Sequence, residues 1–151
     1  MAEYTYNPVQ LVEPGQNVIL NDNIRCNKGY VLHRNESGIV ILRGIVNSPC
    51  GCFARYQVTF NGNIAIPEGG TVGPIAIALA IDGEPILTSR AIVTPAAVEE
   101  YFNVTSTAII TVPKGCCFTV AVENVSGPAA VGGVDPAINV QNANLTVARI
   151  A

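Results

Sequence analysis

An alternating segment near the middle of the chain, Phe53 to Phe60, constrains the fold more than any other feature of the sequence. It reads F-A-R-Y-Q-V-T-F, so Tyr56, Val58 and Phe60 fall on one face and polar residues fall on the other. A two-residue period is that of a strand with one buried face. The segment therefore predicts a strand of a β-sheet that covers a hydrophobic core.

Most of the remaining chain has the same character. Residues 75–81 form a second apolar run, and Asp82-Gly83 after it is typical of a type I′ hairpin turn. Further strands are expected at residues 17–20, 29–33, 39–43, 85–93, 101–112, 117–123 and 144–150. The one helix candidate, residues 95–100, is long enough for at most one turn. The pattern predicts one all-β domain over residues 1–151, a two-sheet antiparallel sandwich of about nine to ten short strands.

The order of these segments resembles that of the trimeric jelly-roll modules of the tumour necrosis factor and complement-subcomponent superfamily, in particular its bacterial and bacteriophage members. The aromatic strand Ala54 to Phe60 and the strand that ends in Asp82-Gly83 carry the resemblance. Residues 14–21 look like the family's opening strand, and residues 145–150 look like its closing strand. The resemblance implies a TNF-like jelly roll that assembles as a homotrimer.

Composition also favours an assembly. Only 13% of the residues are charged, whereas soluble domains average about 25%. Residues 75–81 are apolar on both faces, with isoleucine and leucine on one and alanine on the other, so we expect a neighbouring subunit to cover the second face. The trimer-interface candidates are Tyr56, Tyr101, Phe102, Ile109 and Ile110.

Other classes of function are disfavoured. The formal net charge is −3 and no run of basic residues occurs, which disfavours nucleic-acid binding. No apolar stretch has the length of a membrane helix, and the N-terminus lacks the pattern of a secretory signal, so we expect synthesis in the cytoplasm. His33 is the one histidine, and no nucleophile motif, phosphate loop or cofactor motif accompanies it. The sequence therefore predicts a protein that is not an enzyme and needs no cofactor.

The cysteines are the best candidates for chemistry. Cys50 and Cys52 precede the aromatic strand, Cys116 and Cys117 follow the strand at residues 101–112, and Cys26 stands apart. The resemblance places these two strands side by side and antiparallel, so the four thiols are expected at one edge of the sandwich. Three states stay open: a structural zinc site, although the spacing is not the usual one; one or more disulfides; or reduced, packed thiols.

Two kinds of function remain. The first is a structural one, a trimeric subunit on a particle surface such as a bacteriophage capsid decoration, a head fibre or another virion component, with the spore outer layer as the alternative location. The second is a receptor-binding or carbohydrate-binding trimeric head. The expected partners are further copies of the chain and a capsid or other particle surface.

Overall fold

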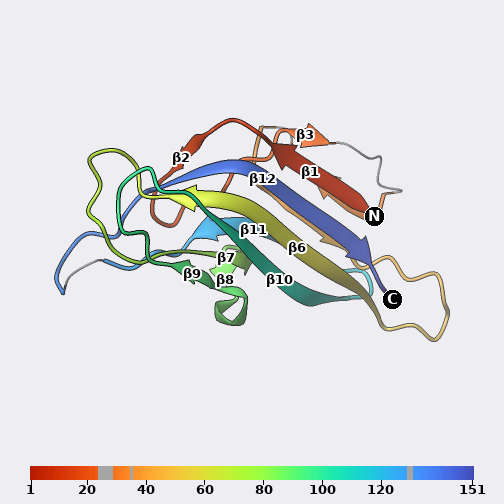
Figure 1. Cartoon of the computed structure of the whole chain (residues 1–151). Helices are drawn as coiled ribbons and strands as arrows, with labels where there is room; N and C mark the ends of the chain where they lie inside the picture. Colours follow the sequence, from red (N-terminus) through yellow and green to blue (C-terminus); the bar gives the residue numbers. More distant parts are fainter. Residues whose placement is uncertain (24–28, 35, 129–130) are drawn as a thin grey trace.

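The chain folds into two six-stranded antiparallel sheets that pack face to face (Figure 1). The computed structural model describes residues 1–23, 29–34, 36–128 and 131–151. Sheet A has the order β10-β6-β12-β1-β3, and β2 also pairs with β12. Sheet B has the order β4-β5-β11-β7-β8, and β9 also pairs with β7. The strands are β1 (Ala2–Tyr6), β2 (Gln10–Val12), β3 (Asp22–Asn23), β4 (Val31–His33), β5 (Val40–Arg43), β6 (Phe53–Ala65), β7 (Ile75–Ile81), β8 (Glu84–Pro85), β9 (Ala91–Val93), β10 (Phe102–Pro113), β11 (Cys117–Asn124) and β12 (Ile138–Arg149).

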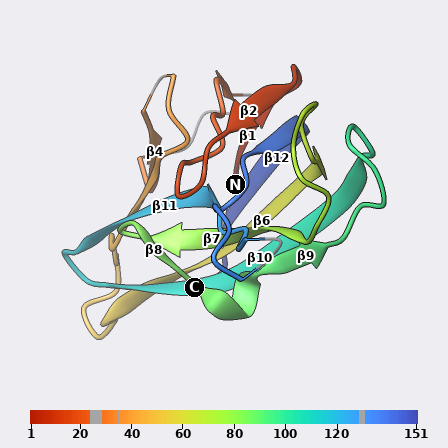
Figure 2. The same ribbon diagram turned by 90° about the vertical axis from the view of Figure 1, so that its left-hand side faces the viewer.

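The alternating segment at residues 53–60 lies in β6, an inner strand of sheet A. Tyr56, Val58 and Phe60 of β6 are fully buried, whereas Arg55 and Gln57 are exposed. β6 pairs along its length with β10 on one side and β12 on the other. The hydrophobic core lies between the two sheets, whose strands Figure 2 shows from the left-hand side of Figure 1. The predicted all-β, two-sheet antiparallel sandwich is confirmed.

Three details differ from the expectations. The segment at residues 17–20 makes only an isolated bridge, Asn17 to Glu123, and the opening strand is instead β1, which pairs with β12. Residues 84–93 form β8, a short 3₁₀ turn (η1, Leu87–Ser89) and β9 in place of one strand. No helix forms at residues 95–100, because Glu99 has a positive φ of 59°, outside the right-handed helical region. The Glu100 carboxylate accepts hydrogen bonds from the backbone N–H groups of Ala96 and Ala97 instead.

The second face of β7 is covered within one chain. Ala76, Ala78 and Ala80 are at most 1% exposed, although they lie on the side of sheet B that faces away from the core. Each of these alanines lies opposite a larger residue of a neighbouring strand: Ile92, Glu123 and Pro85 pair with Ala76, Ala78 and Ala80. The expectation that this face needs a second subunit is therefore wrong.

Among the described residues, no helix is long and apolar enough to span a membrane.

Candidate functional site

The cysteine end of the sandwich is built by two connections that each join sheet A to sheet B. Residues 44–52 lead from β5 to β6, and residues 113–117 turn from β10 into β11. The backbone N–H of Lys114 donates to the carbonyl of Cys52 at 2.9 Å, and the N–H of Gly44 donates to the carbonyl of Cys116 at 2.8 Å. The resemblance's prediction that β6 and β10 are antiparallel neighbours is confirmed, and both cysteine pairs lie at the same end.

The four thiols at this end are free and exposed. Of the three states that the sequence left open, reduced and packed thiols are wrong as to packing, because all four side chains are exposed at this end of the sandwich. The thiol of Cys52 contacts the carbonyl oxygen of Cys50 at 3.8 Å. Among the described residues, no group of three or more His, Cys, Asp or Glu side chains is placed to hold a metal. Cys26 lies outside the described residues.

Basic side chains gather around the same end. Arg43, Arg55, Lys114 and Arg149 all lie on or beside its two connections and the C-terminus, where the N–H of Arg55 donates to the carbonyl of Ala151. The guanidinium of Arg149 stacks 4.4 Å from the centre of the Tyr30 ring, and that of Arg55 stacks 4.7 Å from the Phe53 ring. The thiols therefore sit in a locally basic surface.

The opposite end carries carboxylates and a hollow. The loops at residues 66–74, 94–101 and 131–137 contain Glu68, Glu99, Glu100 and Asp135 and neither lysine nor arginine. Glu99 has a positive φ of 59°, and its carboxylate accepts hydrogen bonds from the N–H of Glu68 at 3.0 Å and the amide of Asn139 at 3.1 Å. Burial and, less strongly, this carboxylate raise the pKa of the Tyr101 hydroxyl.

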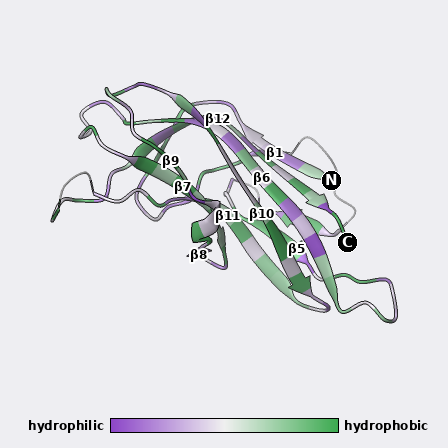
Figure 3. Cartoon of the chain, turned by 60° about the horizontal axis from the view of Figure 1, so that its bottom comes forward, coloured by the Kyte–Doolittle hydropathy of each residue, from purple (hydrophilic) through white to green (hydrophobic). Residues whose placement is uncertain are grey.

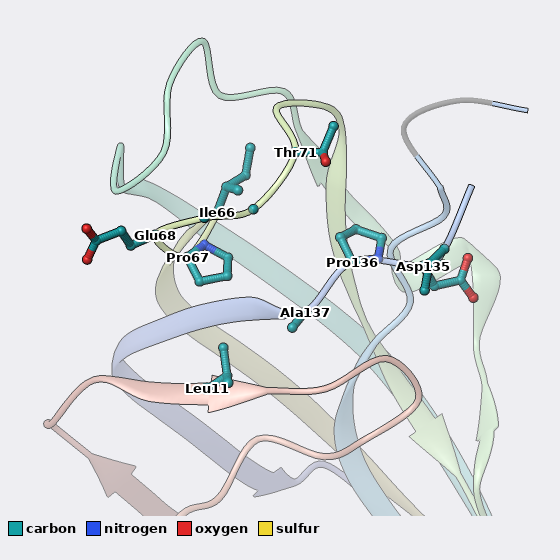
Figure 4. Close-up of a pocket in the computed structure, with 11 residues that line it drawn as sticks. Leu11, Ile66, Pro67, Glu68, Thr71, Asp135, Pro136 and Ala137 are labelled. Carbon is teal, nitrogen blue, oxygen red and sulfur yellow. The ribbon is translucent and has the colours of Figure 1, made fainter.

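The hollow at this end is a cavity of about 400 Å³. Pro67 and Pro136 lie over Leu11 and Ala137, while the carboxylates of Glu68 and Asp135 point away from the centre (Figure 4). Its floor is therefore apolar and its rim is polar, and the lining contains no aromatic ring. Such a shape fits a small ligand with apolar and hydroxyl groups.

Rows of uncharged polar side chains cross the outer face of sheet A between Arg55 at the cysteine end and Glu3 on β1, and sequence reasoning missed them. The amide of Asn103 donates to Asn61 and Asn63, and that of Asn63 donates to Asn142, with distances of 3.0–3.1 Å. Further along the same two strands, the hydroxyls of Thr59 and Thr107, which lie opposite each other, share a hydrogen bond of 3.1 Å. Polar and apolar residues alternate along β6 and β12 (Figure 3). The sequence signal for this surface was the recurrence of asparagine and threonine at every second residue of strands whose other face is apolar.

The five trimer-interface candidates separate into two groups. Tyr56 and Ile110 are at most 2% exposed, because both fall on the inner face of sheet A, so these two candidates are wrong. Ile109 is 65% exposed and Phe102 is 38% exposed, both on the edge strand β10. Tyr101 is half-buried beside the acidic loops. Three of the candidates are thus available to another subunit.

His33 has structural contacts. Its ring stacks on Tyr4 with ring centres 4.7 Å apart, and its Nε2 lies 3.0 Å from the carbonyl oxygen of Ser37. Neither contact is a cysteine, and β4 lies at the edge of sheet B. The arrangement fixes the β4–β5 hairpin against sheet A.

No protein-family model and no curated protein matches the sequence. Among solved structures, the chain is similar to the globular domain of the zebrafish complement 1qA protein, with 15% identity, a TM-score of 0.57, and coverage of 99% of this chain and 97% of that chain. The C-terminal domain of EclA, described as a sugar-binding protein, gives 16% identity, a TM-score of 0.43 and coverage of 95% and 79%. CBM35 from Cellvibrio japonicus Abf62 gives 13% identity, a TM-score of 0.30 and coverage of 95% and 99%. The first likeness shows the jelly-roll fold, and the other two are too distant to support an argument.

Proposed function

We propose that this chain is a non-catalytic structural subunit that assembles as a homotrimer on a particle surface, as a virion component such as a bacteriophage capsid decoration or head fibre. The observation that carries the proposal is the 65% exposure of Ile109 on the edge strand β10, beside Thr107, whose hydroxyl is already hydrogen-bonded to that of Thr59. Covering this side chain with another protein would remove apolar area from water, which is favourable.

The surroundings of Ile109 support a contact between copies. Phe53 and Ile150 are also exposed near the cysteine end and lie on the same outer face of sheet A as Ile109. Along the same face, away from the cysteine end, lie the rows of asparagine and threonine, which carry no charge and therefore need little desolvation when they are covered. A face of this kind suits a standard interface, which buries about 800 Å² on each partner.

The mass in solution tests the assembly. Light scattering should give about three times the chain mass of 15.8 kDa. Ile109→Asp should dissociate the trimer without unfolding the chain, because the side chain already faces solvent in one copy. Leu32→Asp, at an exposed leucine on the outer face of sheet B, is the matched control and should stay trimeric. A wild-type monomer at every concentration would refute the assembly.

The location needs a separate test. Immunogold labelling with an antibody against this chain should mark intact virions from the source culture, with the spore surface as the alternative. Label found only in the cytosolic fraction would rule out the particle role, even where the trimer is confirmed.

A receptor-binding or carbohydrate-binding head is the second candidate, and the cavity between Pro67 and Pro136 favours it. A glycan array probed with the trimer tests this function. Binding that Thr71→Arg abolishes and Thr111→Arg, at the far end of the sandwich, leaves intact would support the second candidate. If no glycan on the array binds, the structural role is the better explanation.

A further inference from the structure

The two cysteine-bearing connections are held against each other by the backbone rather than by their side chains. Besides the hydrogen bonds of Cys52 and Cys116, the N–H of Gly115 donates to the carbonyl of Gly44 at 3.0 Å. A Cβ at Gly44 would lie 1.9 Å from the carbonyl oxygen of Pro113, so the two segments approach too closely for any side chain there. This contact fixes the distance between the cysteine pairs in the folded chain.

Strand alternation selects one cysteine from each pair. Phe53 lies on the outer face of sheet A and Ala54 is fully buried, so Cys52 falls on the inner side of the sheet. Cys117 pairs with Arg43, and Phe118, on the inner side of sheet B, packs on the core. By the same alternation, Cys116 falls on the inner side of sheet B.

A disulfide within either cysteine pair is less favourable than one between the two pairs. Cys116 and Cys117 are adjacent, and Cys50 and Cys52 are separated by one residue, so a disulfide within either pair closes a very small ring. Disulfides need Cα atoms about 4.4–6.8 Å apart and Cβ atoms directed toward each other, whereas the adjacent Cys116 and Cys117 enter β11 with side chains on opposite faces. Cys50 lies in the turn at residues 48–51, where the Cys52 thiol contacts its carbonyl oxygen at 3.8 Å. We propose that Cys52 and Cys116 form an intramolecular disulfide when the folded chain meets an oxidising thiol–disulfide pool.

The oxidant is glutathione disulfide, and the exchange takes two steps. The thiolate of Cys52 attacks one sulfur of glutathione disulfide, forms a mixed disulfide and releases one glutathione thiolate. The thiolate of Cys116 then attacks the Cys52 sulfur, breaks the mixed disulfide and releases the second glutathione. The protein loses two hydrogen atoms and two glutathione molecules are formed. Cytosolic thiol buffers reverse the reaction, so the bond forms after exit from a reducing compartment.

The bond would fasten together two separate crossings between the sheets. Linking positions that are far apart in sequence restricts the unfolded chain strongly, which predicts a rise in the melting temperature of about 5–15 °C on oxidation. Reduction should return the melting temperature to its initial value.

The experiment incubates the folded protein with oxidised glutathione, blocks the remaining thiols with N-ethylmaleimide and maps the peptides by mass spectrometry. We expect a monomeric chain two hydrogen atoms lighter, with one linked peptide that contains Cys52 and Cys116. Cys52→Ser and Cys116→Ser should each abolish this bond and the temperature rise. Cys50→Ser and Cys117→Ser are the matched controls and should retain both.

Three results would overturn the proposal: a bond that uses Cys50 or Cys117 instead, cross-links only between chains, or mixed glutathione disulfides that never resolve. All four serine variants should have the wild-type melting temperature when reduced, since the thiols are exposed. A variant that unfolds in reductant would show that its thiol supports the fold, and the linked peptide in the two control variants then decides the pairing.

Discussion

The hydroxyl of Tyr56 in sheet A donates a hydrogen bond of 2.6 Å to the carbonyl oxygen of Arg43 in sheet B. The same hydroxyl lies 3.2 Å from the carbonyl oxygen of Tyr30, just before β4. Tyr56 is one of three aromatic residues predicted from the sequence to lie at a subunit contact, and it instead joins the two sheets within one chain. The side chain is fully buried, so its hydroxyl forms hydrogen bonds with protein atoms and not with water.

Removal of this hydroxyl should destabilise the fold. We expect Tyr56→Phe to lower the free energy of unfolding by about 2 kcal/mol, because it leaves a buried carbonyl without its donor. For a chain of this size, the melting temperature should fall by roughly 4–8 °C. Tyr6→Phe is the control, since no hydrogen bond of the Tyr6 hydroxyl occurs among the described residues, and it should change stability little. Equal losses in the two variants would contradict the role given to Tyr56.

The same residue predicts a loss of stability in alkali. Burial raises the pKa of Tyr56 above its ordinary value of 10.0, against the opposing effect of Arg149. The folded chain therefore holds this proton more tightly than the unfolded chain does. The resulting stability is present below the unfolded pKa and is lost as the pH rises through the folded pKa. Urea denaturation between about pH 9 and pH 11 should show a steeper decline for the wild type than for Tyr56→Phe, and parallel declines would disprove the prediction.

The sequence predicted those parts of the fold that local periodicity and turn chemistry determine. The segment at residues 75–81 forms a strand with those bounds, and Asp82 and Gly83 have φ angles of 50° and 83°, as a type I′ turn requires. Asn61-Gly62 has similar turn chemistry, yet it lies inside β6. There β10 and β12 both pair with the segment, and the missing side chain of Gly62 makes room for the Phe60 ring, 2.8 Å from where its Cβ would stand.

The site was less predictable because burial depends on partners that sequence alone does not identify. Ile109 and Ile110 are equivalent in the sequence, but alternation places one in solvent and the other in the core. The register that decides which is which follows from the pairing with Gln57 and Tyr56. The cysteine pairs were correctly expected at one end because antiparallel pairing alone brings them there. Their exposure was not expected, because it follows from the two turns.

Glu123 should destabilise the fold at neutral pH. It lies on the outer face of sheet B opposite Ala78, and burial, with a smaller effect of Glu84, raises its pKa above 4.5. A carboxyl group whose pKa is higher in the folded than in the unfolded chain stabilises the fold at pH values below the unfolded pKa. This stability is lost as the pH rises through the folded pKa. Glu123→Gln should therefore raise the melting temperature at about pH 7 and have no such effect at about pH 3.5.

Glu13→Gln is the control for the change in net charge, because Glu13 is an exposed carboxylate in a turn. It should leave the melting temperature nearly unchanged at both pH values. A gain from Glu13→Gln as large as that from Glu123→Gln would attribute the effect to overall charge instead of to the environment of Glu123.

The polar rows of sheet A should belong to the proposed trimer contact, and Thr107 tests this. Its hydroxyl lies 3.1 Å from that of Thr59 at the centre of the outer face, two residues along β10 from Ile109. Thr107→Lys would bring a cation from each copy into these uncharged rows, and burial of an unpaired charge is costly. Light scattering should then show the mass of one chain, with circular dichroism still that of a β protein. Leu32→Lys, on the outer face of sheet B, should remain trimeric. A trimer that tolerates Thr107→Lys would limit the contact to the apolar end around Ile109, Phe53 and Ile150 and leave the asparagine surface exposed to solvent.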